Sequence, residues 1–411
     1  MPGTLKRSFS GLLKSIPENH EFPIQNLPFA CGVPKESKTP NCISRIGDKV
    51  IDLKKLEEQG VFRGTLPDNT FSQSTLNKFM ELGPSHWKKA REILTDKLTN
   101  SQIDFCIRPL SDFKLTLPAQ IGDYTDFYSC KNHRDNCGKM FPKALTPNYE
   151  WVPIAYHGRS SSVMLSGTPV LRPSGQVMPP EASEPLFMKS QWLDYEFEMG
   201  YFIGGKTNSY GETIQVDKAE ENIFGLVILN DWSARDIQAW EYIPLGPFNS
   251  KNFLTTISPW VVTLEALKEF KTEMPQQSPT PLPYLQEKNR SIFDVNLETH
   301  YKASEMENFQ KISSSNLKEL YWSLNQQVTH HTETGCNLRP GDLMGTGTIS
   351  GTTKDSAGSL LEMSEAAKVK IPLPVERFFL QDGDTVKFTA FAQGKGFRVG
   401  FGECTSCVQT S

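Results

Sequence analysis

Residues 193–202 carry the most informative pattern of the chain, Leu-Asp-Tyr-Glu-Phe-Glu-Met-Gly-Tyr-Phe. Apolar side chains stand at 193, 195, 197, 199 and 201, and Asp194, Glu196 and Glu198 stand between them. Because strand side chains alternate between two faces, the pattern predicts a strand with one apolar and one acidic face. The two glutamates then point to the same side, about 7 Å apart along the strand.

Further strands are predicted on either side of this one. The uninterrupted apolar run 223–229 is typical of a buried strand, and alternation returns at 293–299 and 386–390. After Gln-Gly-Lys-Gly the last strand is expected to return over 397–402. One helix is predicted over 317–328, where apolar residues recur at helical spacing. Strands and helices do not alternate regularly, so we expect a mainly β, α+β fold rather than a doubly wound one.

The first hundred residues look like a smaller unit. Residues 43–56 predict a hairpin, and two helices are predicted over 75–82 and 86–98, separated by Gly83-Pro84. The extended pattern over 109–120 marks a boundary. At roughly 150 residues per domain, a chain of 411 residues then divides into domains 1–118 and 119–411.

Composition excludes several classes of protein. The net charge is −4 and the 43 basic residues are dispersed, which argues against a nucleic-acid partner. The longest apolar run is far shorter than the roughly 20 residues that span a bilayer, so no membrane partner is expected. Eight cysteines without dense spacing fit a reducing compartment, and we expect a cytoplasmic protein. The basic, acid-free stretch 1–15 leaves a transit peptide open.

Common catalytic motifs are missing from the sequence. It has no G-x-S-x-G, H-E-x-x-H, P-loop or EF-hand loop. The glycines of 345–351 do not fit the G-x-G-x-x-G spacing of a dinucleotide loop. Cys404 and Cys407 form a lone C-x-x-C, for which two free thiols are the simpler interpretation than a zinc site.

Carboxylates outside these motifs suggest a cation site. Glu196 and Glu198 would repel each other unless solvated on an exposed strand edge or bridged by a cation. Asp231 follows the buried strand, where it could face a crevice or cap the next helix. Asp126 and His133 are seven residues apart and would share a face if that stretch were helical. Carboxylate oxygens without nearby cysteine suit Ca²⁺ or Mg²⁺ better than zinc.

A polar helix face follows Asp231. Arg235, Gln238 and Tyr242 fall at i, i+3 and i+7, and next to the carboxylates this face suggests a substrate cradle, although a solvated face has the same pattern. His133 is a candidate general base. His330 and His331 are interpreted as structural, since they end the predicted helix where imidazoles suit its carbonyls.

Long segments of the chain resemble the fumarylacetoacetate hydrolase family. They include Ile121-Gly-Asp-Tyr-Thr-Asp-Phe-Tyr-Ser, Tyr156-His-Gly-Arg, Asn230-Asp-Trp-Ser-Ala-Arg-Asp-Ile-Gln, Trp240-Glu-Tyr-Ile-Pro-Leu-Gly-Pro-Phe and Gly347-Thr-Ile-Ser-Gly. The resemblance runs from about residue 22 to 402. It implies a small SH3-like N-terminal barrel followed by a large mixed β-roll domain, in a homodimer.

The resemblance also implies an activity, which is hydrolysis of a carbon–carbon bond of a diketo acid, 4-fumarylacetoacetate, to fumarate and acetoacetate in tyrosine and phenylalanine catabolism. His133 matches the proton acceptor and Glu362 the carboxylate that orients it, and Arg235, Gln238 and Lys251 would stabilise the oxyanion. The implied Ca²⁺ ligands are Asp126, Glu196, Glu198 and Asp231, and the residues around Mg²⁺ are Asp231, Lys251 and Thr255. An ammonium cannot ligate a cation, so Lys251 is expected to act through its backbone carbonyl. The implied substrate contacts are Tyr128, Tyr156, Gln238, Tyr242 and Thr348.

One departure concerns the substrate carboxylate. The family commonly has Arg directly after the Met-Phe pair, whereas here Met140-Phe141 is followed by Pro142-Lys143. Lys143 is expected to substitute, although it lacks the bidentate fork of Arg. Two alternatives remain at this point: an acylpyruvase or oxaloacetate decarboxylase acting on a smaller keto acid, and a cation-binding scaffold without catalysis.

Overall fold

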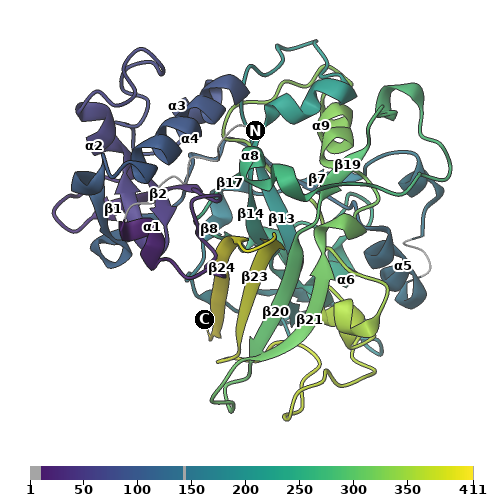
Figure 1. Ribbon diagram of the computed structural model, residues 1–411. Helices are drawn as coiled ribbons and strands as arrows, with labels where there is room; N and C mark the ends of the chain where they lie inside the picture. The colour runs from purple at the N-terminus through teal and green to yellow at the C-terminus, as the bar shows by residue number, and fades with distance from the viewer. Residues whose placement is uncertain (1–10, 142–144, 411) are drawn as a thin grey trace.

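The computed structural model describes residues 11–141 and 145–410. Strands dominate it, and helices pack around them, so the predicted α+β class is confirmed in its coarse form (Figure 1). No helix within the described ranges combines the length and the apolar character that a membrane span requires.

The N-terminal unit is built on a five-stranded antiparallel sheet (purple in Figure 1). Its order is β4 (Ile107–Pro109), β3 (Lys49–Asp52), β2 (Asn41–Ile46), β1 (Phe29–Pro34) and β5 (Phe113–Thr116). The predicted hairpin is β2–β3, which turns at Gly47-Asp48. Its helices are α1 (Gly11–Ser15), α2 (Leu53–Glu58), α3 (Asn77–Glu81) and α4 (Pro84–Thr99). Proline begins α4, as its fixed φ allows at a first helical position.

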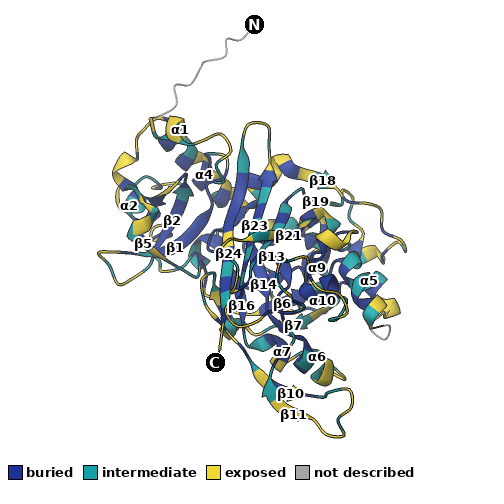
Figure 2. Ribbon diagram, turned by 90° about the horizontal axis from the view of Figure 1, so that it is seen from below, coloured by how far each residue is buried: buried dark blue, intermediate teal, exposed yellow. Residues whose placement is uncertain are grey.

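An eight-stranded mixed sheet forms the centre of the rest of the chain. Its path is β7 (Ala155–His157), β6 (Tyr124–Phe127), β22 (Leu343–Gly345), β13 (Phe197–Ile203), β14 (Ile223–Asp231), β16 (Thr255–Ile257) and β8 (Val163–Leu165), with β17 (Val262–Thr263) also on β14. The pairs β6–β22 and β8–β16 are parallel. Every residue of β13 and β14 is buried, which explains the uninterrupted apolar run in β14 (Figure 2).

A second large sheet covers one side of this one. It runs β21 (Gln310–Asn316), β20 (Asn296–Lys302), β23 (Thr385–Gln393), β24 (Arg398–Gln409) and β9 (Val170–Leu171). Tyr201 and Ile228 pack with its residues, such as Phe388 and Val399, in one core. The opposite side of β13 and β14 packs with the N-terminal unit, so the central sheet is covered on both faces.

The remaining elements are short. Two-stranded pairs are β10 (Ser174–Val177) with β11 (Leu186–Lys189), β12 (Leu193–Asp194) with β15 (Ser233–Ala234), and β18 (Lys271–Glu273) with β19 (Ser291–Phe293). The remaining helices are α5 (Lys131–Met140), α6 (Arg235–Glu241), α7 (Asn249–Asn252), α8 (Leu264–Leu267), α9 (Leu324–Thr332) and α10 (Leu360–Met363).

Two predicted elements are wrong in detail. The stretch 193–202 is not one strand, because it breaks between β12 and β13, where Glu196 instead bridges to Ser359. The helix predicted over 317–328 begins only at Leu324, where Ser323 caps it through a reciprocal pair of hydrogen bonds with Gln326. The apolar spacing upstream of Ser323 belongs to a single 3₁₀ turn and a loop.

Candidate active site and cation site

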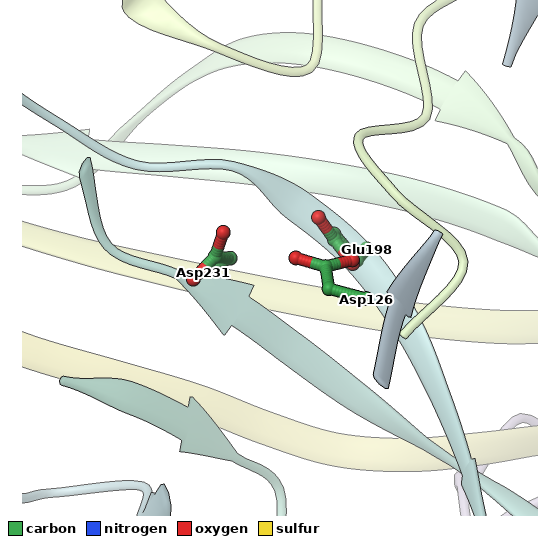
Figure 3. A group of neighbouring side chains, drawn as sticks. All are labelled: Asp126, Glu198 and Asp231. Atoms are coloured by element: carbon green, nitrogen blue, oxygen red, sulfur yellow. The ribbon is translucent and has the colours of Figure 1, made fainter. Parts of the chain in front are cut away.

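Three carboxylates from three strands meet inside the central sheet. Asp126 lies on β6, Glu198 on β13 and Asp231 at the end of β14, and one oxygen from each lies within 4.8 Å of the others. Figure 3 shows these side chains turning toward a common space. Their exposed fractions are 2%, 0% and 1%. Glu196 is also only 6% exposed, so the alternative of a solvated strand edge at Glu196 and Glu198 is wrong.

Strand order makes this convergence possible. β22 lies between β6 and β13, and its Gly345 is paired with Asp126 on one side and Gly200 on the other. A Cβ at Gly345 would lie 2.8 Å from Glu198 Oε2 and 2.9 Å from Asp126 Oδ1. Because glycine has no Cβ, position 345 leaves room for these carboxylate oxygens.

The carboxylates lack enough protein partners to be stable as anions. Asp126 Oδ1 and Glu198 Oε1 are buried and receive no hydrogen bond from any described residue. Burial, reinforced by the neighbouring carboxylates, raises the pKa of Asp126 and of Glu198 well above the usual values. Burial also raises the pKa of Asp231, with Lys251 opposing it. Orphaned oxygens in a space kept open by glycine fit a divalent cation.

Glu196 lies beside this triad but has other partners. Its Oε1 lies 2.8 Å from Arg235 Nη2, and its Oε2 accepts a hydrogen bond from Lys251. Although burial opposes ionisation, these two cations hold the pKa of Glu196 below its usual value. The carboxylate lies within the cluster, 3.9 Å from His133, but outside the group of converging oxygens. Its role as a fourth ligand stays a prediction.

The side chain of Lys251 contacts the carboxylates through its ammonium. Its ammonium is buried and donates to Glu196 and, at 2.5 Å, to Asp231 Oδ2. Burial opposes the charge, but these carboxylates raise the pKa of Lys251 above its usual value. The contribution of its backbone carbonyl stays a prediction. Thr255, paired with Asp231 across β14 and β16, donates to Asp231 Oδ1 at 3.4 Å.

His133 and Glu362 form a buried pair next to the carboxylates. Asp126 and His133 do not share a helix, because Asp126 is on β6 and His133 lies in the first turn of α5, which begins at Lys131. His133 Nδ1 lies 2.7 Å from Glu362 Oε2, which leaves Nε2 facing Glu196 at 3.9 Å. Burial disfavours the imidazolium, but the neighbouring Cys137 and Glu362 raise the pKa of His133 well above its usual value. A bound cation nearby would oppose that effect.

Glu362 is held from several directions. Asn136 donates to its Oε1 at 3.0 Å, and Ser350 and Ser359 donate to its Oε2 at 2.9 and 2.8 Å. Despite burial, His133 and these donors keep the pKa of Glu362 below its usual value. A carboxylate fixed in this way can hold the Nδ1–H tautomer of His133 and leave Nε2 free to accept a proton.

The polar face of α6 reaches the carboxylate cluster through Arg235, which contacts Glu196. Asp231 does not cap α6, since the N-cap residue is Ala234. Arg235 is buried and donates through Nη1 to Gln238 Oε1 at 3.1 Å, so the two side chains act as one unit. Tyr242 ends the helix and is half-buried.

The other predicted substrate contacts have separate positions. Tyr156 donates to Asp126 Oδ2 at 2.9 Å and Asp231 Oδ2 at 3.0 Å, so in this structure it contacts two of the carboxylates. Tyr128 stands edge-on to the His133 ring, at 5.4 Å between centroids. Thr348 is buried in the loop after β22. Lys143 lies outside the described residues.

Several other predictions concern side chains outside the site. His330 Nδ1 pairs with the Tyr284 hydroxyl at 3.0 Å, and His331 Nε2 with Thr125 at 2.9 Å, which is consistent with structural roles. Burial lowers the pKa of both imidazoles. Cys404 and Cys407 both lie on β24, and neither forms a disulfide.

The sequence interpretation gave no role to Asp194. This buried carboxylate accepts from the backbone N–H of Leu360 at 2.7 Å and Leu361 at 3.0 Å, and from Arg235 Nε at 2.9 Å. It therefore joins the start of α10, which carries Glu362, to Arg235. Two sequence features could have indicated this arrangement. Asp194 alternates with Glu196 and Glu198 on one face, and the Ser359-x-x-Glu362 pattern is typical of the start of a helix, here α10.

Asp194→Asn is expected to destabilise the fold by about 3 kcal/mol, because it leaves Arg235 buried with one ion-pair partner fewer. Urea denaturation measures the change. Asp123→Asn, which loses an exposed ion pair with Arg339, is the matched control and should cost less than about 1 kcal/mol. Equal stability of the Asp194 variant and the parent would contradict this assignment.

Gly345→Ala is expected to weaken cation binding by about 10–100-fold, because the added methyl must displace two carboxylate oxygens. Isothermal titration with Ca²⁺ or Mg²⁺ measures the affinity. Gly32→Ala on β1 is the control, since its Cβ would meet ordinary contacts of 3.4 Å or more. Unchanged affinity in the Gly345 variant would show that the space beside Gly345 does not hold the cation.

These features define a class: a sheet-rich α+β protein whose buried acidic cation site adjoins a His–Glu pair. Comparison of the sequence with models of protein families agrees with this class of protein. Residues 124–409 match the fumarylacetoacetate (FAA) hydrolase C-terminal domain, and residues 25–118 match the fumarylacetoacetase N-terminal domain. The chain belongs to the fumarylacetoacetate hydrolase family.

Individual relatives extend over almost the whole chain. Fumarylacetoacetase from Dictyostelium discoideum is 46% identical over 418 residues, covering 97% of this chain and 98% of the relative. The Homo sapiens fumarylacetoacetase is 45% identical over 410 residues, covering 96% and 97%.

Solved structures share the fold at low identity. Fumarylacetoacetate hydrolase from Exiguobacterium antarcticum has a TM-score of 0.55 at 18% identity, covering 94% of this chain and all of that one. Maleylpyruvate hydrolase from Sphingobium sp. SYK-6, in complex with manganese(II) and pyruvate, has a TM-score of 0.52 at 14% identity, with 94% and 100% covered.

Proposed function

We propose that this chain is an enzyme that hydrolyses the carbon–carbon bond of 4-fumarylacetoacetate to give fumarate and acetoacetate. The observation that carries the proposal is the His133–Glu362 pair beside three converging carboxylates in a chain about 45% identical to fumarylacetoacetases over nearly its full length. A scaffold without catalysis would have no use for a buried His–Glu pair in this position.

The proposed cation is Ca²⁺ or Mg²⁺, held by Asp126, Glu198 and Asp231, with Glu196 as a further ligand. Hard carboxylate oxygens favour these ions. When bound, the cation supplies Lewis-acid stabilisation of the diketone oxygens. Thr255 and the backbone of Lys251 belong to the proposed Mg²⁺ surroundings.

In the proposed mechanism His133 Nε2 takes a proton from water, while Glu362 holds the Nδ1–H of the same ring. The water oxygen bonds to the substrate carbonyl carbon, and that carbonyl oxygen becomes an oxyanion. Arg235, Gln238 and Lys251 stabilise it by hydrogen bonds, each worth about 10²–10³ in rate. Breaking of the carbon–carbon bond then leaves the acetoacetate carbanion, which takes the proton from His133.

Substrate positioning is proposed for Tyr128, Tyr156, Gln238, Tyr242 and Thr348. Lys143 is proposed as the cation for a substrate carboxylate in place of Arg. The relative orientation of these groups sets which diketo acid fits.

The oligomeric state, the location and the metabolic role are also proposed from the family. We infer a homodimer in the cytoplasm that acts in tyrosine and phenylalanine catabolism, without a nucleic-acid or membrane partner. The finer fold description, an SH3-like barrel over 1–118 and a β-roll catalytic domain over 119–411, belongs to the same proposal.

A direct assay tests the activity. The purified enzyme is given fumarylacetoacetate, an acylpyruvate and oxaloacetate in turn, with and without chelator. Turnover is expected with fumarylacetoacetate, at a kcat/KM at least about tenfold above the others, and is expected to stop with chelator. Preference for acylpyruvate or oxaloacetate would favour the smaller-substrate alternative, and no turnover with any of them would favour a scaffold.

A further inference from the structure

Tyr124 has a buried hydroxyl that neither the fold nor the proposed mechanism uses. The residue is on β6, two positions before Asp126, so both side chains lie on the same side of the strand. It is 3% exposed, and although Thr255 lies close enough to interact with its hydroxyl, no described residue meets the geometry of a hydrogen bond with it. Leaving a buried hydroxyl unpaired costs about 1–3 kcal/mol, so a partner in the space that this hydroxyl faces would stabilise the side chain.

The position of the hydroxyl indicates that partner. The point that a Cβ of Gly345 would occupy lies 3.3 Å from the Tyr124 hydroxyl, 2.8 Å from Glu198 Oε2 and 2.9 Å from Asp126 Oδ1. Oxygens of three side chains thus border one small space. Two oxygens of this cluster, Asp126 Oδ1 and the Tyr124 hydroxyl, lack a hydrogen bond within the described part of the chain.

Tyr124 differs in this respect from its neighbour Tyr156. The Tyr156 hydroxyl is already used, since it donates to Asp126 and Asp231. Neutral oxygens complete the coordination of hard cations when carboxylates alone do not fill it.

We propose that the Tyr124 hydroxyl is part of the cation site, as a neutral oxygen that contacts the bound cation or its hydration water. This inference rests on the cation site of the proposed function and adds a residue to it. The hydroxyl then supports cation affinity and adds nothing to the stability of the metal-free fold, whereas the ring belongs to the hydrophobic core.

The test compares Tyr124→Phe with a matched variant, Tyr195→Phe. Tyr195 also has a buried hydroxyl without a hydrogen bond, but its ring packs edge-on against Phe388 in the core, with 5.3 Å between centroids. Calcium and magnesium affinities are measured by isothermal titration on the full-length protein, and thermal unfolding is followed with and without each cation. Both readouts are independent of turnover.

Tyr124→Phe is expected to raise the Kd about tenfold while the metal-free Tm does not fall. Tyr195→Phe is expected to keep the Kd within about twofold of the parent. An unchanged Kd for Tyr124→Phe, or equal weakening in both variants, would overturn the assignment while leaving the cation site and the proposed function intact. Absence of binding in the parent protein would instead overturn both.

Discussion

His133→Ala is expected to lower kcat by about 10³-fold or more, because the proposed mechanism has no other group to take the proton from water. The imidazole is buried, and its Nδ1 lies 2.7 Å from Glu362 Oε2. A base from the buffer therefore has little access to take over its role in the variant. The measurement is steady-state turnover of fumarylacetoacetate.

The result is informative if the variant still folds and binds its cation, since His133 is not among the three converging ligands. Metal content and thermal unfolding provide that check. His330→Ala is the matched control, because this imidazole contacts Tyr284 and should be dispensable for turnover. A His133→Ala enzyme with near-normal kcat would reject the general-base assignment.

Glu198→Gln is expected to reduce kcat/KM at least about 100-fold at limiting cation, with partial recovery in excess cation. The change keeps the shape of the side chain and removes one of three converging charges. It also places an amide where Oε2 accepts from the Gly347 N–H at 3.0 Å. Titration of activity against Ca²⁺ or Mg²⁺ separates lost affinity from lost chemistry.

A partly buried glutamate serves as the control for this change. Glu287 accepts hydrogen bonds from Ser323 and Asn325, and it does not belong to the carboxylate triad. Burial raises the pKa of its carboxyl. Glu287→Gln should leave the cation dependence of turnover unchanged. If Glu198→Gln showed the parent's cation dependence, Glu198 would not be a ligand.

Local patterns predicted several strands of the two large sheets. The apolar run placed β14 in the central sheet, and alternation placed β20, β23 and β24 in the second sheet, because burial on one or both faces imposes a pattern that a single sequence displays. The hairpin β2–β3 and the break before Pro84 followed from turn and helix-start chemistry.

The errors have one common physical cause, which is that local spacing does not reveal tertiary partners. The apolar series from Leu317 onward has helical spacing, yet the Ser323 cap fixes the start of α9. Asp126 and His133 are neighbours in sequence but reach the site from a strand and a helix. The strand at 193–202 breaks because Glu196 bridges to Ser359, a residue 163 positions away that no local pattern indicates.

The candidate site was predictable in its residue types but not in its geometry. Acidic residues at strand positions pointed to oxygen ligands, and the family resemblance supplied Glu362 as the partner of His133. Strand order, which brings β6, β22, β13 and β14 side by side, is a long-range property. The parts played by Gly345 and Tyr124 follow from that order, and nothing in the sequence alone selects them. Asp194 shares the acidic register of Glu196 and Glu198, but its contacts with α10 and Arg235 are long-range.

Removal and return of the cation tests the central claim most directly. The enzyme is dialysed against chelator, its metal content is measured, and turnover of fumarylacetoacetate is followed as Ca²⁺ or Mg²⁺ is titrated back. We predict turnover at background level in the stripped protein and recovery that saturates near one cation per chain. Full turnover by protein shown to contain no divalent cation would contradict the account.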